Sequence, residues 1–133
     1  MKKKYRIITC VVATVWLLAG TTQASAKKWE CGERSNLPLE GKNYCAAGDF
    51  RQSEINLLKV FDPLVERYKH IYGNATDLQQ AQDAYEMYRS SQCIAENQRI
   101  ADKPYYPMLV AQCKTKLTNL RIGELQRMLA KLP

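Results

Sequence analysis

The chain has 133 residues, 46% of them hydrophobic, with 20 basic and 13 acidic side chains and one histidine. This length suits one small domain and excludes a large multidomain enzyme. Four of the basic residues lie within the first 26 positions, so residues 27–133 carry 16 basic and 13 acidic side chains and a net charge of +3. An excess this small and this dispersed does not indicate the clustered basic patch of a nucleic-acid-binding protein.

The first 26 residues have the pattern of a secretory signal peptide. Four basic side chains within the first six residues precede the uncharged run IITCVVATVWLLA at 7–19, and the small residues ASA follow at 24–26. The run is shorter than the roughly 20 apolar residues of a membrane-spanning helix, although an uncleaved N-terminal anchor is the alternative. We therefore expect cleavage after residue 26, a folded domain over residues 27–133, a periplasmic or secreted location, and no membrane attachment after cleavage.

Four cysteines remain after Cys10 is removed with the signal peptide: Cys31, Cys45, Cys93 and Cys113. An even number of cysteines in a short exported domain favours two disulfides. A zinc site is the alternative, but the chain has no CxxC or HxxxH spacing and His70 is its only histidine. Three pairings are possible. A bond between Cys31 and Cys45, which is part of one of these pairings, would close a local loop and tether the N-terminal segment.

Residues 27–48 contain three glycines, one proline and no sustained apolar period, which predicts loop or short turns. From residue 49 an amphipathic helix is indicated by apolar side chains that recur every three or four residues: Leu57, Phe61, Leu64, Tyr68 and Ile71. Pro63 lacks an N–H and its ring clashes with the preceding turn, so we expect a kink or a break near Asp62, which could cap a second helix. Gly73 and Asn74 predict the helix end.

The next helix is predicted to begin at Thr76, with Gln79 at the spacing of a capping box. Its apolar stripe is expected at Leu78, Ala81, Tyr85, Tyr88, Gln92 and Ala95. Tyr85 and Tyr88 lie about one turn apart on this stripe, which favours a buried aromatic pair. A binding groove is the alternative interpretation of the two tyrosines.

The segment KPYYP at 103–107 should interrupt the helix, and the last helix is predicted to begin near Pro107 or Met108. Cys93 precedes Lys103 by ten residues and Cys113 follows it by ten, so two antiparallel helices joined here would bring both sulfurs to the same height. A disulfide there would staple the hairpin and contribute about 3 kcal/mol. Because no segment shows sustained strand alternation, the predicted fold is all-α: a three- or four-helix bundle with a disulfide-tethered N-terminal loop.

No pattern of catalytic residues accompanies this fold. The chain has no GxSxG, P-loop or dinucleotide-binding glycine motif. His70 stands near a predicted helix C-terminus, where a cation is favoured. We therefore predict a protein that is not an enzyme and needs no cofactor or metal; a small enzyme that depends on His70 is the alternative.

Residues 78–93 resemble the signature of the lysozyme inhibitor LprI-like domain, through Ala81, Gln82, Tyr85, Tyr88, Arg89 and Cys93. The last helix adds a similar closing pattern: Cys113, Leu117, Thr118, Arg121, Glu124 and Leu125. Cys31 and Cys45 resemble the early cysteine pair of the family. The chain departs from the family pattern at Tyr85, where tryptophan is usual, at Leu58, where asparagine is usual, and at Pro63. The resemblance implies an exported α-helical domain that in some members inhibits lysozyme.

The implied partner is a protein, such as lysozyme or another cell-wall hydrolase, that is inhibited when the chain fills its cleft. Lysozyme uses a pair of carboxyl groups, and the loop before the last helix offers hydrogen-bond donors to such oxygens from Lys103, Tyr105 and Tyr106. A net charge of +3 gives no long-range steering toward basic animal lysozymes, so an immunity protein against a rival's toxin is an alternative. An envelope assembly module without inhibitory activity is a further alternative.

Overall fold

The computed structural model describes residues 28–133, and its regular structure is entirely helical. Three long helices follow one another: α1 (Leu39–Tyr72), α2 (Thr76–Glu96) and α3 (Tyr106–Ala130). Two short 3-10 helices accompany them: η1 (Arg34–Asn36) and η2 (Gln98–Ile100). The all-α prediction is confirmed. The predicted signal peptide, residues 1–26, lies outside the described residues.

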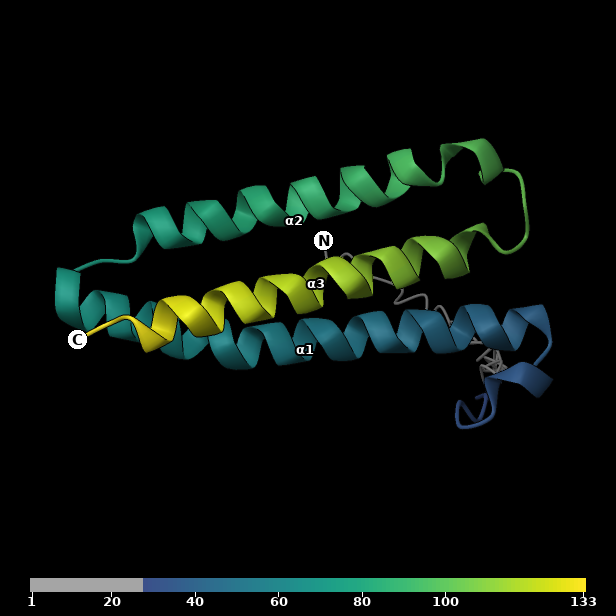
Figure 1. Cartoon of the computed structure of the whole chain (residues 1–133), viewed down its shortest axis with the longest axis horizontal. Helices are drawn as coiled ribbons and strands as arrows, with labels where there is room; N and C mark the ends of the chain where they lie inside the picture. Colours follow the sequence, from purple (N-terminus) through teal and green to yellow (C-terminus); the bar gives the residue numbers. More distant parts are fainter. Residues whose placement is uncertain (1–27) are drawn as a thin grey trace, which may run out of the picture.

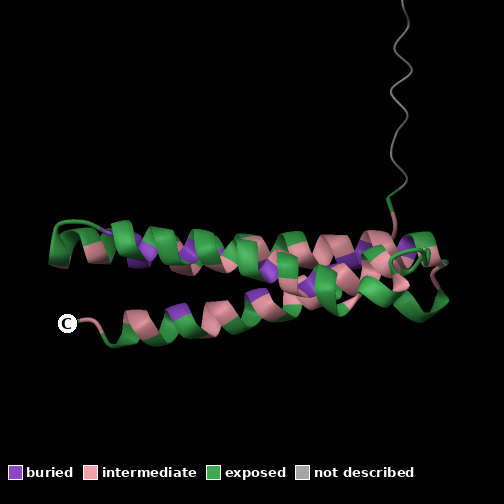
Figure 2. Cartoon of the chain, turned by 90° about the horizontal axis from the view of Figure 1, so that it is seen from above, coloured by how far each residue is buried: buried purple, intermediate pink, exposed green. Residues whose placement is uncertain are grey.

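The three helices run up, down and up again (Figure 1). α3 lies alongside α1, and α2 returns in the opposite direction and contacts α3. In the view from above, the buried residues of α3 lie on the side that faces the other two helices (Figure 2). Residues 97–107, which connect α2 to α3 and include the first residues of α3, form one end of the bundle and are called the tip below. None of the helices within residues 28–133 combines the length and the apolarity that crossing a membrane requires.

The helix α1 begins ten residues earlier than predicted, at Leu39 rather than Asp49. Its first turn starts after the extended residue Pro38, whose carbonyl accepts a hydrogen bond from the Lys42 amide at 3.0 Å. The segment before it folds back on this turn, because a Cβ added at Gly41 would meet the Trp29 ring at 3.0 Å. Glycine at position 41 therefore lets the N-terminal segment pack closely on α1.

The predicted break at Pro63 is wrong, because α1 continues through this residue to Tyr72. Pro63 is exposed, as is Lys59, whose carbonyl loses its helical donor. That carbonyl lies where water can replace the missing N–H, so the usual cost of an interior proline is reduced. The following residues Leu64 and Val65 are buried, and their packing holds the next turn in place.

The main apolar cluster lies at the end of the bundle away from the tip. The second half of α1, the start of α2 and the end of α3 supply its residues: Leu57, Leu64, Val65, Ala75, Leu78 and Leu125. Leu64 and Leu125 are fully buried, and such a side chain contributes about 2 kcal/mol by leaving water. The tip end of the bundle contributes no residue to this core, so other interactions must hold the helices together there.

The turn between α1 and α2 agrees with the prediction at Gly73 and differs at Thr76. Gly73 adopts the left-handed conformation with φ 81°, and its amide donates to the Lys69 carbonyl at 2.9 Å. α2 does begin at Thr76, but no side-chain capping box forms. Instead the Asn74 Oδ1 atom accepts a hydrogen bond from the Thr76 amide at 3.2 Å.

Candidate functional site

The buried face of α2 is rotated by one residue from its predicted position. Gln82, Arg89 and Cys93 are buried where Ala81, Tyr88 and Gln92 were expected. Tyr88 is 54% exposed, so the predicted buried tyrosine pair is wrong, although the rings of Tyr85 and Tyr88 do lie 6.5 Å apart. The inner side of α2 toward the tip is thus lined by polar side chains and one half-cystine.

Arg89 connects all three helices. Its guanidinium donates to the Thr118 hydroxyl of α3 at 2.9 Å and forms an ion pair with Glu54 of α1, also at 2.9 Å. The same guanidinium lies 4.9 Å from the centre of the Phe50 ring. Its side chain is only 5% exposed, whereas that of Glu54 is 42% exposed. A charge buried this far needs partners, and the two terminal nitrogens of Arg89 find them on both neighbouring helices, whereas its buried Nε atom has no hydrogen-bond partner among the described residues.

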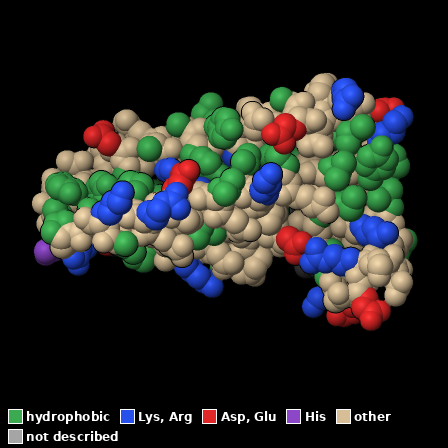
Figure 3. Space-filling view, viewed as in Figure 1, with side chains coloured by type: hydrophobic (Ala, Val, Ile, Leu, Met, Phe, Trp, Pro, Cys, Tyr) green, Lys and Arg blue, Asp and Glu red, His purple; other side chains and the backbone are tan. Residues whose placement is uncertain are grey.

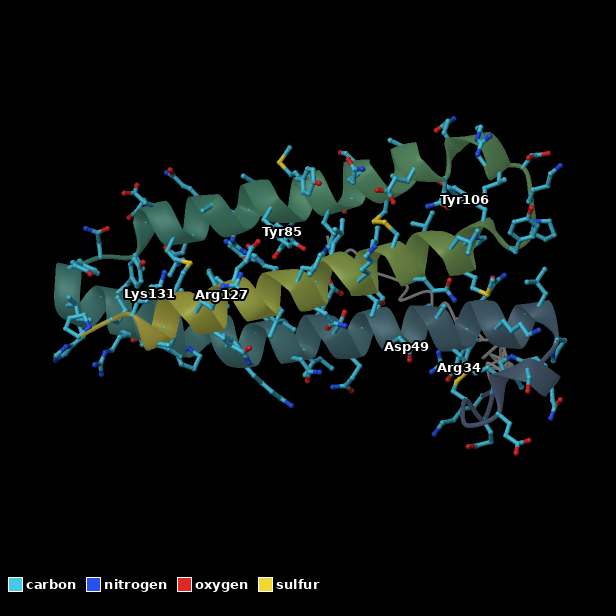
Figure 4. The ribbon with its side chains drawn as sticks, viewed as in Figure 1. Arg34, Asp49, Tyr85, Tyr106, Arg127 and Lys131 are labelled. Atoms are coloured by element: carbon cyan, nitrogen blue, oxygen red, sulfur yellow. A yellow bond between two sulfur atoms is a disulfide. The ribbon has the colours of Figure 1, made fainter. Side chains whose placement is uncertain are left out.

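A second polar cluster lies about two turns nearer the start of α2. The Gln82 side chain accepts a hydrogen bond from Arg121 of α3 at 3.2 Å, and Arg121 forms an ion pair with Glu124 at 3.0 Å. The Arg121 guanidinium also lies 5.2 Å from the centre of the Tyr85 ring, which points from α2 toward α3 (Figure 4). Burial raises the pKa of Tyr85, an effect that the nearby Arg89 and Arg121 charges partly oppose.

Both predicted disulfides are confirmed: Cys31–Cys45 and Cys93–Cys113, each with its Cα atoms 5.6 Å apart. The second joins α2 to α3 directly behind the tip and closes a segment with a sequence separation of 20 residues. All four cysteines within the described residues are thus oxidised and paired. No group of three or more His, Cys, Asp or Glu side chains in residues 28–133 is arranged to hold a metal ion.

The tip is fixed to all three helices. The Asn97 side chain donates to the Cys93 carbonyl at 2.9 Å, which anchors the tip to the end of α2. The backbone of the tip then forms two successive turns. The Lys103 amide donates to the Ile100 carbonyl at 2.9 Å, and the Tyr106 amide donates to the Lys103 carbonyl at 3.0 Å. From α1, the Asn43 side chain donates to the Pro104 carbonyl at 3.0 Å. These contacts leave the tip backbone little freedom.

The three predicted binding residues occupy two different environments. Lys103 is half exposed and forms an ion pair with Asp102 at 2.8 Å, and Tyr105 is 37% exposed. Tyr106 is half-buried and lines a groove of about 260 Å³ between α1 and α3, together with Phe50, Val110 and Lys114. Hydrophobic side chains gather over this end of the molecule (Figure 3). Lys103 and Tyr105 are therefore more exposed to solvent than Tyr106 is.

The part of α1 that supports the tip is held by the N-terminal segment. Near the Cys31–Cys45 disulfide, Arg34 forms a bidentate ion pair with Asp49, one of whose hydrogen bonds measures 2.8 Å (Figure 4). The hydrogen bond from Arg34 lowers the pKa of Asp49. Beside Asp49, a shallow hollow of about 510 Å³ is lined mainly by polar side chains of α3. Sequence patterns gave no signal for this hollow, because its residues come from two helices far apart in the chain.

The model of the family described as lysozyme inhibitor LprI matches residues 34–125. No curated protein and no solved structure matches the chain significantly.

The residues that carry the resemblance prove to be mostly internal: Gln82, Arg89, Cys93, Thr118 and Leu125 are buried, and Arg121 is half-buried. They connect the helices rather than face a partner. The matched span covers more than half of the chain, and the chain therefore belongs to the lysozyme inhibitor LprI family.

Proposed function

We propose that the chain is an exported, non-enzymatic inhibitor of lysozyme or of another peptidoglycan-cleaving enzyme, and that its tip occludes the cleft of that enzyme. The family description supports an inhibitor, and the signal-peptide pattern of residues 1–26 supports a periplasmic or secreted location. The observation that carries the proposal is the fixation of the tip by all three helices and by the Cys93–Cys113 disulfide.

A fixed tip favours tight binding because less conformational freedom is lost when the partner binds. An inhibitor that fills a cleft has to hold its inserted backbone in one shape. The Asn43, Cys93 and turn contacts of the tip do this before any partner arrives. The exposed Lys103 and Tyr105 side chains then project from a rigid base.

The chemistry of these two side chains suits a cleft that contains carboxyl groups. Lysozyme-type enzymes cleave glycosidic bonds with a pair of them. The Lys103 ammonium and the Tyr105 hydroxyl can donate hydrogen bonds to such oxygens. Lys103 must exchange Asp102 for the new partner, but an exposed ion pair of this kind contributes only about 0–1 kcal/mol. The exchange therefore costs little.

A lysis assay with matched variants tests the proposal. The oxidised chain is mixed with a panel of muramidases and amidases, and the clearing of a turbid cell-wall suspension is followed. The double variant Lys103→Ala/Tyr105→Ala should lose inhibition. The control variant Lys69→Ala/Tyr72→Ala changes the same residue types at the opposite end, where Lys69 is also half exposed in an ion pair and Tyr72 is 57% exposed.

Full inhibition by the Lys103→Ala/Tyr105→Ala variant would refute the role of the tip. Equal loss by the control variant would show a general effect of the substitutions instead. Inhibition of a bacterial toxin rather than of lysozyme would make the chain an immunity protein. If no hydrolase in the panel is inhibited and the chain co-purifies with one envelope protein, the chain is an assembly module and the proposal fails.

A further inference from the structure

The face of α2 that points away from the bundle is apolar at its centre. Met87 is 73% exposed and Ile94 is 45% exposed. Together with Asp83 and Ser90 they follow one another in steps of four, three and four residues, which places them on one side of the helix. We call these four residues the outer stripe. Asp83, Met87 and Ser90, with Glu86 and Ser91 beside them, line an open hollow of about 500 Å³.

The charges of α2 are unusual for a domain with a net positive charge. The helix carries four carboxylates and one cation: Asp77, Asp83, Glu86, Glu96 and Arg89. Arg89 is turned inward to Glu54, and none of the four carboxylates forms an ion pair with a residue in 28–133. Figure 3 shows acidic and hydrophobic side chains along α2, whereas Lys and Arg side chains gather over α3. Of these carboxylates, Asp83 belongs to the outer stripe and Glu86 lines the hollow beside it, so this face of α2 is both apolar and acidic.

We infer that the outer stripe of α2 is a docking surface for a basic protein. Removing the exposed Met87 and Ile94 side chains from water lowers the free energy of the complex. The carboxylates of Asp83 and Glu86, which form no ion pair within residues 28–133, select a partner of positive charge. A second copy of the chain fits poorly, since a twofold contact would place Asp83 and Glu86 against their own equivalents. Nucleic acids and anionic lipid surfaces carry negative charge, so the same carboxylates repel them.

This inference rests on the proposed function and narrows its target to a basic hydrolase. Animal lysozymes belong to that class, and the overall charge of +3 would otherwise disfavour them. The acidic stripe supplies a local attraction that the net charge conceals. It also ends beside the tip, because Ile94 lies three residues before Asn97. From Met87 to the end of α2 is about 15 Å, so one partner can contact the outer stripe and the tip together.

Calorimetric titration of the oxidised chain against a basic lysozyme tests the inference. The variant Asp83→Asn/Glu86→Gln should bind about tenfold more weakly at low ionic strength, and the difference should shrink as salt is added. Met87→Ser should weaken binding about tenfold at both salt concentrations, because it removes apolar area.

Two controls change the same residue types on α1. Asp62→Asn/Glu66→Gln removes two exposed carboxylates, and Leu58→Ser removes a side chain that is 50% exposed. Both should bind the lysozyme as the unchanged chain does. Circular dichroism spectra identical to that of the unchanged chain show that each variant has folded.

The outcomes separate this inference from the proposed function. If the unchanged chain does not bind the basic lysozyme, or if the α2 variants bind it as tightly as the controls do, the inference is overturned. Binding that depends on α2 without inhibition of lysis supports the inference and refutes the proposed function. Inhibition confined to an acidic hydrolase supports the proposed function and overturns the inference. Retained binding with lost inhibition in Lys103→Ala/Tyr105→Ala supports both.

Discussion

The ion pair between α1 and α2 should respond very differently to the loss of each partner. In Glu54→Ala the buried Arg89 guanidinium keeps the Thr118 hydroxyl and the Phe50 ring but loses the one carboxylate that pairs with it among the described residues. In Arg89→Met the remaining Glu54, already 42% exposed, returns to water, and Thr118 keeps its bond to the Lys114 carbonyl at 2.8 Å. The first change leaves a buried charge without a counter-charge, and the second does not.

The expected magnitudes follow from this asymmetry. A buried charge left without its partner costs about 3–5 kcal/mol, and the lower end applies here because two other contacts of Arg89 remain. Glu54→Ala should therefore destabilise the protein by about 3 kcal/mol. Arg89→Met loses a hydrogen bond but fills the site with apolar atoms, so its cost should be about 1 kcal/mol. Once Arg89 is methionine, adding Glu54→Ala should cost less than about 0.5 kcal/mol.

Thermal and urea unfolding followed by circular dichroism, with both disulfides oxidised, measures these differences. In a domain of this size about 3 kcal/mol corresponds to a decrease in Tm of about 12 °C, and about 1 kcal/mol to about 4 °C. Equal losses of stability in the two single variants, or a larger loss for Arg89→Met, would show that Glu54 does not stabilise the buried charge of Arg89.

Three further changes have defined outcomes. Replacing Cys93 and Cys113 together by serine should lower the free energy of unfolding by about 3 kcal/mol and weaken inhibition of lysis; unchanged inhibition would show that the tip needs no staple. Gly73→Ala should cost about 1 kcal/mol in urea unfolding, since position 73 has a positive φ, and no loss would contradict the left-handed cap. Because Arg34 lowers the pKa of Asp49, the pair adds stability above the unfolded pKa of about 4 and loses it as the pH falls through the lower folded value. Asp49→Asn should thus remove less than about 1 kcal/mol near pH 7 and progressively less as the pH falls below about 4, and an effect that does not change with pH would exclude the ion pair as its cause.

Apolar spacing and cysteine spacing predicted what depends on local sequence. Leu57 and Leu64 lie in the core as the period of α1 indicated. Cys93 and Cys113 meet because a hairpin brings equidistant positions together. Thr76 begins α2 because a glycine ends the preceding helix. In each case the determining pattern lies within one helix, one turn or one helical hairpin, where spacing along the sequence indicates it.

The errors occurred where distant residues decide the outcome. Arg89 and Gln82 lie off the predicted apolar stripe, yet both are buried because Thr118 and Arg121 on α3 provide hydrogen-bond partners. An apolar period cannot register such pairs, so the face of α2 was predicted one residue out of place. Near the early start of α1, Trp29 packs against Gly41, and the apolar period of the helix does not indicate this contact either.

For the candidate site, the sequence indicated the exposed side chains Lys103 and Tyr105 but not the support beneath them. The hydrogen bond from Asn43 to Pro104 joins residues 61 positions apart in the sequence, and no local pattern predicts it. The outer stripe was also missed, because Met87 and Ile94 were not on the predicted apolar face and the net charge of +3 concealed the acidic character of α2.

Competition for the cleft tests the proposed inhibition most directly. A lysozyme that the chain inhibits is first saturated with a short chitooligosaccharide that fills its cleft, and the affinity of the oxidised chain is then measured by titration. If the tip occupies the cleft, the apparent Kd should rise in proportion to the oligosaccharide concentration. An unchanged Kd, with inhibition of lysis preserved, would show that the chain acts from outside the cleft.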